Sequence, residues 1–155
     1  MVKITLDLTA RGWLSVKLFN GLNEVEIYAS YLSDGPRELI SSARTILTGF
    51  PFATCRLQAE PGEHRLIFEQ NGESVQLKVL EFASSFSTES NNQGKLIFEG
   101  TESAGSIARQ IKRQFDRLLY NHGIDGYKSL WGHEFPKDQV TQLTETFTLY
   151  KSKKY

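Results

Sequence analysis

Hydrophobic and polar residues alternate through most of the first hundred positions of the chain. The first three runs with this two-residue period lie at about residues 3–9, 14–18 and 25–29, and turns at Arg11-Gly12 and Asn20-Gly21 separate them. A two-residue period is typical of a strand with one buried face. The pattern therefore predicts an antiparallel meander of three strands at the start of the chain.

Residues 36–48 change to the 3.6-residue period of an amphipathic helix. Pro36 suits the first helical turn, and Gly49 suits a left-handed exit from the last one. The apolar stripe consists of Leu39, Ile40, Ala43, Ile46 and Leu47. Both ends of this helix are marked, and its stripe predicts that it lies against the sheet.

A second block of alternating residues follows the helix. Its predicted strands lie at about 53–59, 64–70, 73–82 and 95–99. Asn71-Gly72 between two of them is typical of a hairpin, because both central residues of a type I′ turn need a positive φ. Residues 83–94 are small and polar, which predicts a mobile loop that can serve as a contact site.

The last third of the chain has the helical period again. It predicts helices at about 104–121 and 136–149, and an irregular loop between Gly123 and Gly132 that pins Tyr127 and Trp131. The predicted architecture is thus α+β, in one domain of residues 1–155. It has an antiparallel sheet of about six or seven strands, with the three helices packed mainly on one face.

Length and composition add the broad class. The chain has 155 residues, 39% of them hydrophobic and 23% charged, as in ordinary globular proteins. No apolar run approaches the roughly 20 residues of a membrane-spanning helix, and the alternating N-terminus does not resemble a signal peptide. We therefore expect a cytoplasmic protein without membrane contact. The single cysteine, Cys55, falls on the apolar side of a predicted strand, which favours a packing role.

Charge is unevenly distributed although the net charge is zero. Residues 60–102 hold eight glutamates against three basic residues, and residues 105–117 hold four basic residues against one aspartate. These segments are either solvated outer faces, or the first is an acidic surface that steers a basic partner. The basic residues Arg109, Lys112, Arg113 and Arg117 have helical spacing and could follow a phosphate backbone. The neutral total argues against nucleic acid as a partner.

No motif in the sequence predicts catalysis. It has no glycine-rich phosphate loop, no cysteine pair for zinc, no His-Glu-x-x-His and no Gly-x-Ser-x-Gly. His64 neighbours Glu63, but adjacent strand residues point to opposite faces. His122, Asp125 and His133 all lie near predicted loops and could form the metal site of a small enzyme, although their spacing matches no established pattern. We expect no catalysis, cofactor or metal, with that enzyme as the alternative.

Residues 28–82 carry a resemblance. The stretch begins with Tyr31-Leu32-Ser33-Asp34, an amphipathic helix closed by Gly49, and a strand. It continues with Glu60-Pro61-Gly62-Glu63, Arg65 two places on, and a hydrophobic hairpin. This succession resembles the immunity proteins that accompany polymorphic or contact-dependent bacterial toxins, with a departure at Leu66, where that pattern has an aromatic residue. The resemblance implies a cytoplasmic α+β protein that neutralises one toxin by binding it, without catalysis of its own.

The resemblance transfers no binding residues, so contacts are predicted from charge alone. Carboxylates at Glu60, Glu63, Glu69 and Glu73 are suited to Arg or Lys side chains of a basic toxin, such as a nuclease, in a heterodimer. A regulatory binding protein without a toxin is the other alternative.

Overall fold

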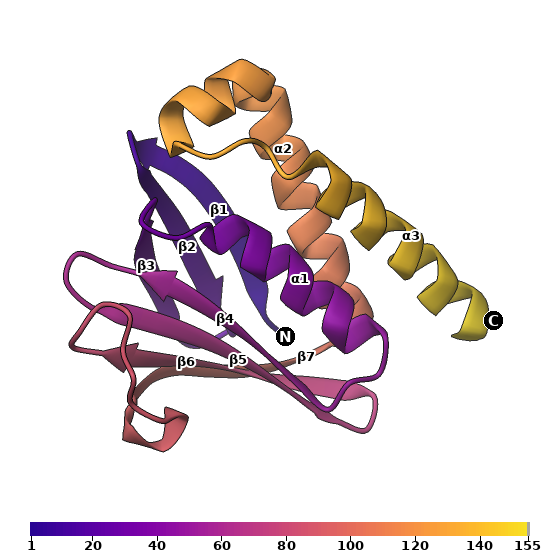
Figure 1. The fold of residues 1–155 in the computed structure, drawn as a ribbon. Helices are drawn as coiled ribbons and strands as arrows, with labels where there is room; N and C mark the ends of the chain where they lie inside the picture. Colours follow the sequence, from indigo (N-terminus) through magenta and orange to yellow (C-terminus); the bar gives the residue numbers. More distant parts are fainter. Residues whose placement is uncertain (155) are drawn as a thin grey trace.

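The computed structural model describes residues 1–154 and shows two sheets beside a layer of helices (Figure 1). The described residues form seven strands, three α-helices and one short 3₁₀ helix. The strands are β1 (Lys3–Ala10), β2 (Trp13–Phe19), β3 (Glu24–Ser30), β4 (Phe52–Gln58), β5 (Glu63–Asn71), β6 (Ser74–Phe82) and β7 (Lys95–Ser103). The helices are α1 (Gly35–Leu47), η1 (Asn91–Gln93), α2 (Ala104–Trp131) and α3 (Lys137–Lys154). The α+β class is confirmed.

The first three strands form the predicted meander. They pair antiparallel in the order β1-β2-β3, and Leu6, Val16 and Ile27 face one another across the three strands. All three side chains are at most 3% exposed, because this face of the sheet meets the core. The alternating pattern therefore placed the buried face of this sheet correctly.

The remaining strands form a four-stranded antiparallel sheet in the order β4-β5-β6-β7. The predicted hairpin between β5 and β6 forms, but its turn lies one residue later than predicted. Asn71 ends β5 and pairs with Ser74, so the two central residues are Gly72 and Glu73. Gly72 has a φ of 66°, whereas neither Asn71 nor Glu73 has a positive φ, so the predicted type I′ turn is not formed. Glycine adopts such a φ at low cost, which explains its place at the first central position of the turn.

The strand number agrees with the sequence, but the strands are divided between two sheets where one was predicted. α1 follows β3 directly, so the chain returns as β4 at the edge of a separate sheet. The other edge of β1 pairs with no strand among residues 1–154. Side chains of α2 bond to it instead, for example Gln110 Oε1, which accepts from the Ile4 amide at 2.9 Å. Helix α2 thus occupies the place beside β1 where another strand could have paired.

The three α-helices lie on the same side of the two sheets, as predicted, and leave the other faces of the sheets outside (Figure 1). One continuous core fills the space between them. It includes Leu39 of α1, Phe115 of α2, Leu143 of α3 and Phe68 of β5, all of them at most 1% exposed. Burial of side chains of this size is the main source of stability in such a core.

The prediction that α2 ends at residue 121 and gives way to an irregular loop is wrong. Gly123 has a non-helical backbone (φ 70°, ψ 174°) and kinks the chain, but a second helical segment continues to Trp131. Tyr127 and Trp131 are one turn apart on this segment, and both are fully buried. Their burial stabilises a helix in a stretch whose glycines and aspartate predict a loop. Gly132, at a φ of 100°, then ends the helix.

Two expectations from composition concern the core and the membrane. Cys55 in β4 is fully buried, and burial raises the pKa of its thiol well above the usual value, which agrees with a packing role. Over residues 1–154, none of the helices combines the length and the apolar character needed to cross a membrane.

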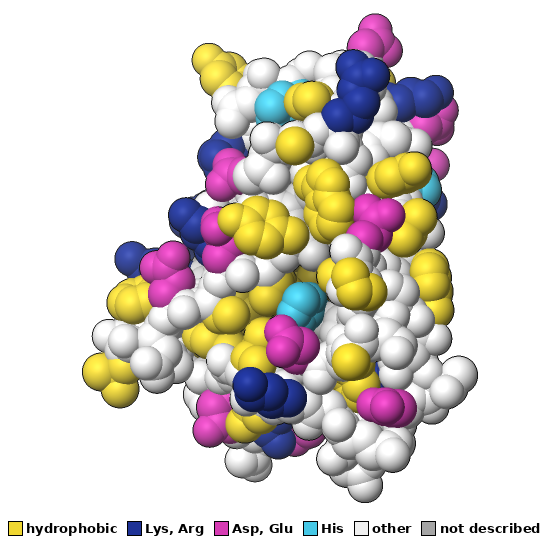
Figure 2. Space-filling view, turned by 90° about the vertical axis from the view of Figure 1, so that its left-hand side faces the viewer, with side chains coloured by type: hydrophobic (Ala, Val, Ile, Leu, Met, Phe, Trp, Pro, Cys, Tyr) yellow, Lys and Arg dark blue, Asp and Glu magenta, His cyan; other side chains and the backbone are white. Residues whose placement is uncertain are grey.

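The side of the molecule that lies to the left in Figure 1 carries mixed side chains. In Figure 2, hydrophobic, acidic and basic groups are interspersed over this side, and neither sign of charge dominates it. Opposite charges also meet directly on the three-stranded sheet, where Lys17 Nζ lies 3.6 Å from Glu26 Oε2. This face therefore does not favour a partner by its charge.

Candidate binding surface on the four-stranded sheet

The four carboxylates predicted as partner contacts do not form one patch. Glu60 lies in the turn before β5, Glu63 begins that strand, Glu69 lies near its end and Glu73 lies in the turn after it. Because a strand advances about 3.3 Å per residue, the first two and the last two lie at opposite ends of the sheet. The expectation of a single acidic hairpin surface is therefore corrected to two separate places.

Glu63 is also not on the surface. Its side chain is fully buried, so its carboxylate cannot be offered to a partner in this structure. Arg65 Nε donates to Glu63 Oε2 at 2.6 Å, and Gln58 Nε2 donates to Glu63 Oε1 at 2.6 Å. A buried carboxylate needs such partners, because removing a charge from water without compensation is costly. Glu60 remains exposed and accepts a hydrogen bond from Ser30 Oγ at 2.9 Å.

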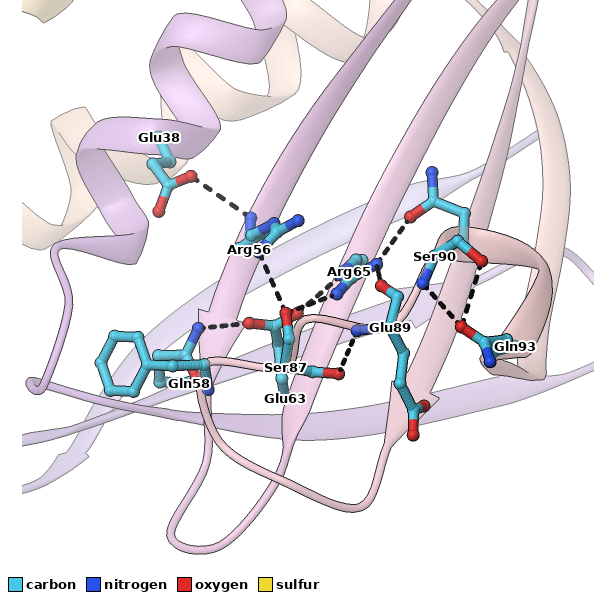
Figure 3. Close-up of polar contacts among 11 residues, drawn as sticks. Glu38, Arg56, Gln58, Glu63, Arg65, Ser87, Glu89, Ser90 and Gln93 are labelled. Carbon is cyan, nitrogen blue, oxygen red and sulfur yellow. Dashed lines mark hydrogen bonds and ion pairs between the residues drawn. The ribbon is translucent and has the colours of Figure 1, made fainter.

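Arg65 binds the loop of residues 83–94, which we call the strap, through hydrogen bonds. The guanidinium donates to the Glu89 carbonyl at 2.8 Å, to Asn91 Oδ1 at 2.9 Å and to the Ser87 carbonyl at 3.1 Å (Figure 3). Its carbon Cζ also lies 3.9 Å from the centre of the Phe82 ring, within the range of a cation–π contact. The strap is thus anchored to the outer face of the four-stranded sheet, although its composition predicts a mobile loop.

A second set of contacts fixes the start of the strap. The Phe86 amide donates to Gln58 Oε1 at 2.7 Å, so Gln58 joins the buried Glu63 to the backbone of Phe86. Phe86 has a φ of 49°, a left-handed conformation that residues other than glycine rarely adopt, and its side chain is 58% exposed. The strap therefore presents an aromatic side chain to solvent from a backbone that the hydrogen bonds hold in place.

The end of the strap packs closely on the sheet. A Cβ atom at Gly94 would lie 2.6 Å from the Phe82 ring, so any larger residue would require the ring to shift. A capping box between Ser90 and Gln93 caps the N-terminal end of the 3₁₀ helix that precedes Gly94. Gly94 lies over Phe82 and Leu80, which together with Ile67 form a small cluster of buried residues separate from the main core.

Beside the strap lies a groove of about 420 Å³ on the same outer face. Ile67, Leu80 and Leu96 supply its apolar surface, and Glu69 and Glu99 supply two carboxylates. Lys78 lies between the two acidic strand positions and approaches Glu69 Oε1 at 3.7 Å. The remaining lining residues are Asn91, Asn92 and Gly94. The groove combines an apolar surface with an excess of negative charge, which suits the stem and head of a basic side chain.

The open edge of the sheet at β4 is covered by α1. Glu38 Oε1 accepts a hydrogen bond from the Arg56 backbone amide at 3.4 Å (Figure 3). Burial raises the pKa of the Glu38 carboxyl, and the hydrogen bond from Arg56 opposes that rise. Arg56 itself donates from its guanidinium to the Ser87 carbonyl at 3.4 Å.

The alternative metal site is not formed. Among the residues that the structure describes, no three His, Cys, Asp or Glu side chains are grouped so that they could hold a metal ion, so His122, Asp125 and His133 do not form one. His133 Nε2 lies 2.7 Å from the Tyr31 carbonyl oxygen instead. His64 pairs with Glu81 of the neighbouring strand, at 3.2 Å between Nε2 and Oε2, and not with the adjacent Glu63.

The basic residues of α2 are likewise not one stripe. Lys112 Nζ pairs with Asp116 on the same helix at 2.7 Å, and Arg117 pairs with Asp7 of β1 at 2.9 Å. Arg109 and Arg113 face a different groove, between α2 and β1.

Sequence reasoning identified Glu69 of the candidate surface but missed Phe86, Leu96 and Glu99. Glu99 was one of eight glutamates in the acidic segment, and nothing in that count distinguished it. Phe86 is an aromatic residue inside an otherwise small and polar loop, and this contrast was the available signal.

No family model and no curated protein matches this chain. Among solved structures, it is similar to one chain of the "CdiA-CT/CdiI toxin and immunity complex from Enterobacter cloacae", with a TM-score of 0.48 and 12% sequence identity. The match covers 75% of this chain and 99% of that chain. A likeness at this level carries no argument about what this chain does.

Proposed function

We propose that this protein is an immunity protein, which binds a cognate toxin in the cytoplasm and neutralises it without catalysis of its own. One observation carries the proposal. The exposed ring of Phe86 projects from a left-handed backbone position on a strap that a buried ion pair anchors to the sheet. Such an arrangement is suited to binding another protein.

The physical argument begins with the backbone of Phe86. A residue other than glycine in the left-handed region costs on the order of 1–3 kcal/mol, and such residues cluster at functional sites because their surroundings hold them there. Here the Gln58 side chain binds the Phe86 amide, and Gln58 is itself fixed by Glu63. Phe86 thus loses little backbone freedom when a partner covers it, which favours tight binding.

The groove beside the strap indicates the chemistry of the partner. Glu69 and Glu99 place two carboxylates next to the apolar side chains of Ile67 and Leu96, and Lys78 offsets one of the two charges. An arginine or lysine can lay its methylene stem on this surface and direct its charge to a carboxylate. The partner is therefore a protein with a basic binding surface, and Glu73, exposed in the turn after β5, extends the acidic region that attracts it.

The proposal is tested with Phe86→Ala and a matched control. Tyr120→Ala also removes an exposed aromatic ring, but from α2, where the side chain is 90% exposed. The tagged chain should capture from its host a stoichiometric basic protein that stops growth when it is expressed alone. We expect Phe86→Ala to weaken this complex about 30-fold, as for an aromatic hot spot of about 2 kcal/mol, and Tyr120→Ala to leave it within about twofold.

Two results would contradict the proposal. Equal affinity of the Phe86→Ala variant and the parent chain would remove the strap from the interface. A captured partner that is harmless when expressed alone would favour the alternative of a regulatory binding protein without a toxin. Because Phe86 is exposed, the variant should keep the unfolding midpoint of the parent, and this is checked first.

A further inference from the structure

A second groove, of about 440 Å³, runs between β1 and the first half of α2, away from the strap. β1 is the edge strand of its sheet, and its outer backbone groups face the helix. Glutamine side chains of α2 bind them. Gln110 Oε1 accepts from the Ile4 amide at 2.9 Å, and Gln114 Oε1 accepts from the Leu6 amide at 3.1 Å. The strand edge at these residues is therefore already satisfied and is not open to pairing with another strand.

Two further acceptors of this groove, the Val2 carbonyl and the Glu102 carboxylate, are engaged as well. The Val2 carbonyl accepts from Gln110 Nε2 at 2.8 Å. The one carboxylate that lines the groove, Glu102, accepts from the Val2 amide at 3.1 Å and from the Ser103 amide at 2.9 Å. A ligand that bound to the Val2 carbonyl or the Glu102 carboxylate would compete with these hydrogen bonds.

The cationic side chains of the groove lack acidic partners. Lys3, Arg109 and Arg113 line the groove, are exposed, and form no ion pair with any side chain that the structure describes. Other basic residues of the same helix do have acidic partners, as Lys112 and Arg117 show. The groove therefore gathers positive charge without acidic partners, while its one carboxylate is already engaged, and this balance favours an anionic ligand.

We infer that this groove binds an extended acidic segment of a protein partner. Arg109 and Arg113 are four residues apart on α2, which places them about 6 Å apart along the helix axis. Carboxylates at alternate positions of an extended chain are spaced about 6.6 Å apart, so each guanidinium can meet one carboxylate. Lys3 contributes from the β1 side of the groove. The neutral total charge of the chain disfavours the other polyanion of this spacing, single-stranded nucleic acid.

The test uses the complete chain and a fluorescent peptide of alternating glutamate and threonine, with glutamine in place of glutamate as the control peptide. Binding is followed by fluorescence anisotropy and by amide chemical shifts. We expect the acidic peptide to shift the amides of β1 and of α2 near residues 106–114. The double variant Arg109→Gln/Arg113→Gln should weaken the peptide at least about tenfold, because it removes two charge-assisted contacts.

The control variant Lys112→Gln/Lys128→Gln removes the same charge from α2 outside this groove and should change the affinity less than about twofold. Equal weakening by both double variants would mean that net charge alone attracts the peptide, and would overturn the inference. A thymidine oligonucleotide that binds the groove more tightly than the peptide would also overturn the inference. Amide chemical shift changes confined to elements other than β1 and α2 would overturn it as well. No toxin takes part in this experiment, so its failure leaves the proposed function standing.

Discussion

Replacing Arg65 by methionine is expected to lower the free energy of unfolding by about 3–5 kcal/mol, because it leaves the buried carboxylate of Glu63 without its cation. Arg65 is 1% exposed and anchors the strap through three further acceptors. The loss should appear as a lower midpoint in urea unfolding. Hydrogen exchange of the strap amides should also become faster, since the anchor is gone.

The control for this change is Arg56→Met. Arg56 is also an arginine beside the strap, but it is exposed and makes a single long bond of 3.4 Å from its guanidinium to the Ser87 carbonyl. Its replacement should change stability by no more than about 0.5 kcal/mol. The double variant Glu63→Met/Arg65→Met should recover much of the loss, because no unpaired charge stays buried. If Arg65→Met costs no more than Arg56→Met, the strap is not held by this ion pair.

Replacing Trp131 by alanine is expected to destabilise the protein by about 3–5 kcal/mol, the usual cost of removing a large aromatic side chain from a core. Trp131 is fully buried at the end of α2, and its Nε1 donates to Asp34 Oδ1 at 3.2 Å, just before α1. The variant loses this link between the two helices along with the packing of the ring. The measurement is the unfolding midpoint in urea at unchanged slope.

Tyr120→Ala is the matched control for this prediction, because it shortens an aromatic residue of the same helix that is 90% exposed. It should shift stability by no more than about 0.5 kcal/mol. A small effect of Trp131→Ala would contradict the account in which burial of Tyr127 and Trp131 stabilises the helical segment after Gly123.

Local sequence patterns were sufficient to predict those elements whose pattern fits only one type of secondary structure. The alternation around Val16 and the stripe around Leu39 each fit one secondary structure, and each was found. The segment after Gly123 shows the limit of this reasoning. Its glycines and aspartate favour a loop locally, while burial of Tyr127 and Trp131 favours a helix. Tertiary packing decided between them, and the local pattern contains no measure of packing.

The candidate site was harder to predict for a related reason. Gln58 lies between Leu57 and Ala59, and Arg65 precedes Leu66, which is also the pattern of polar residues on a solvated sheet face. Glu63 lies between Gly62 and His64, which gives no sign of burial either. The three polar residues are buried because the strap crosses over them, and the path of the strap is fixed only by the contacts it makes there. Glu63 was therefore expected on the surface. Glu69, beyond the reach of the strap contacts, does line the outer groove.

Titration of the isolated toxin partner with this chain tests the central claim, neutralisation by binding alone, most directly. The residual toxic activity should fall in a straight line and vanish when the two proteins are present in equal molar amounts. A chain that abolishes the activity of many toxin molecules in turn, leaving them chemically altered after it is removed, would instead be an enzyme and would contradict the account.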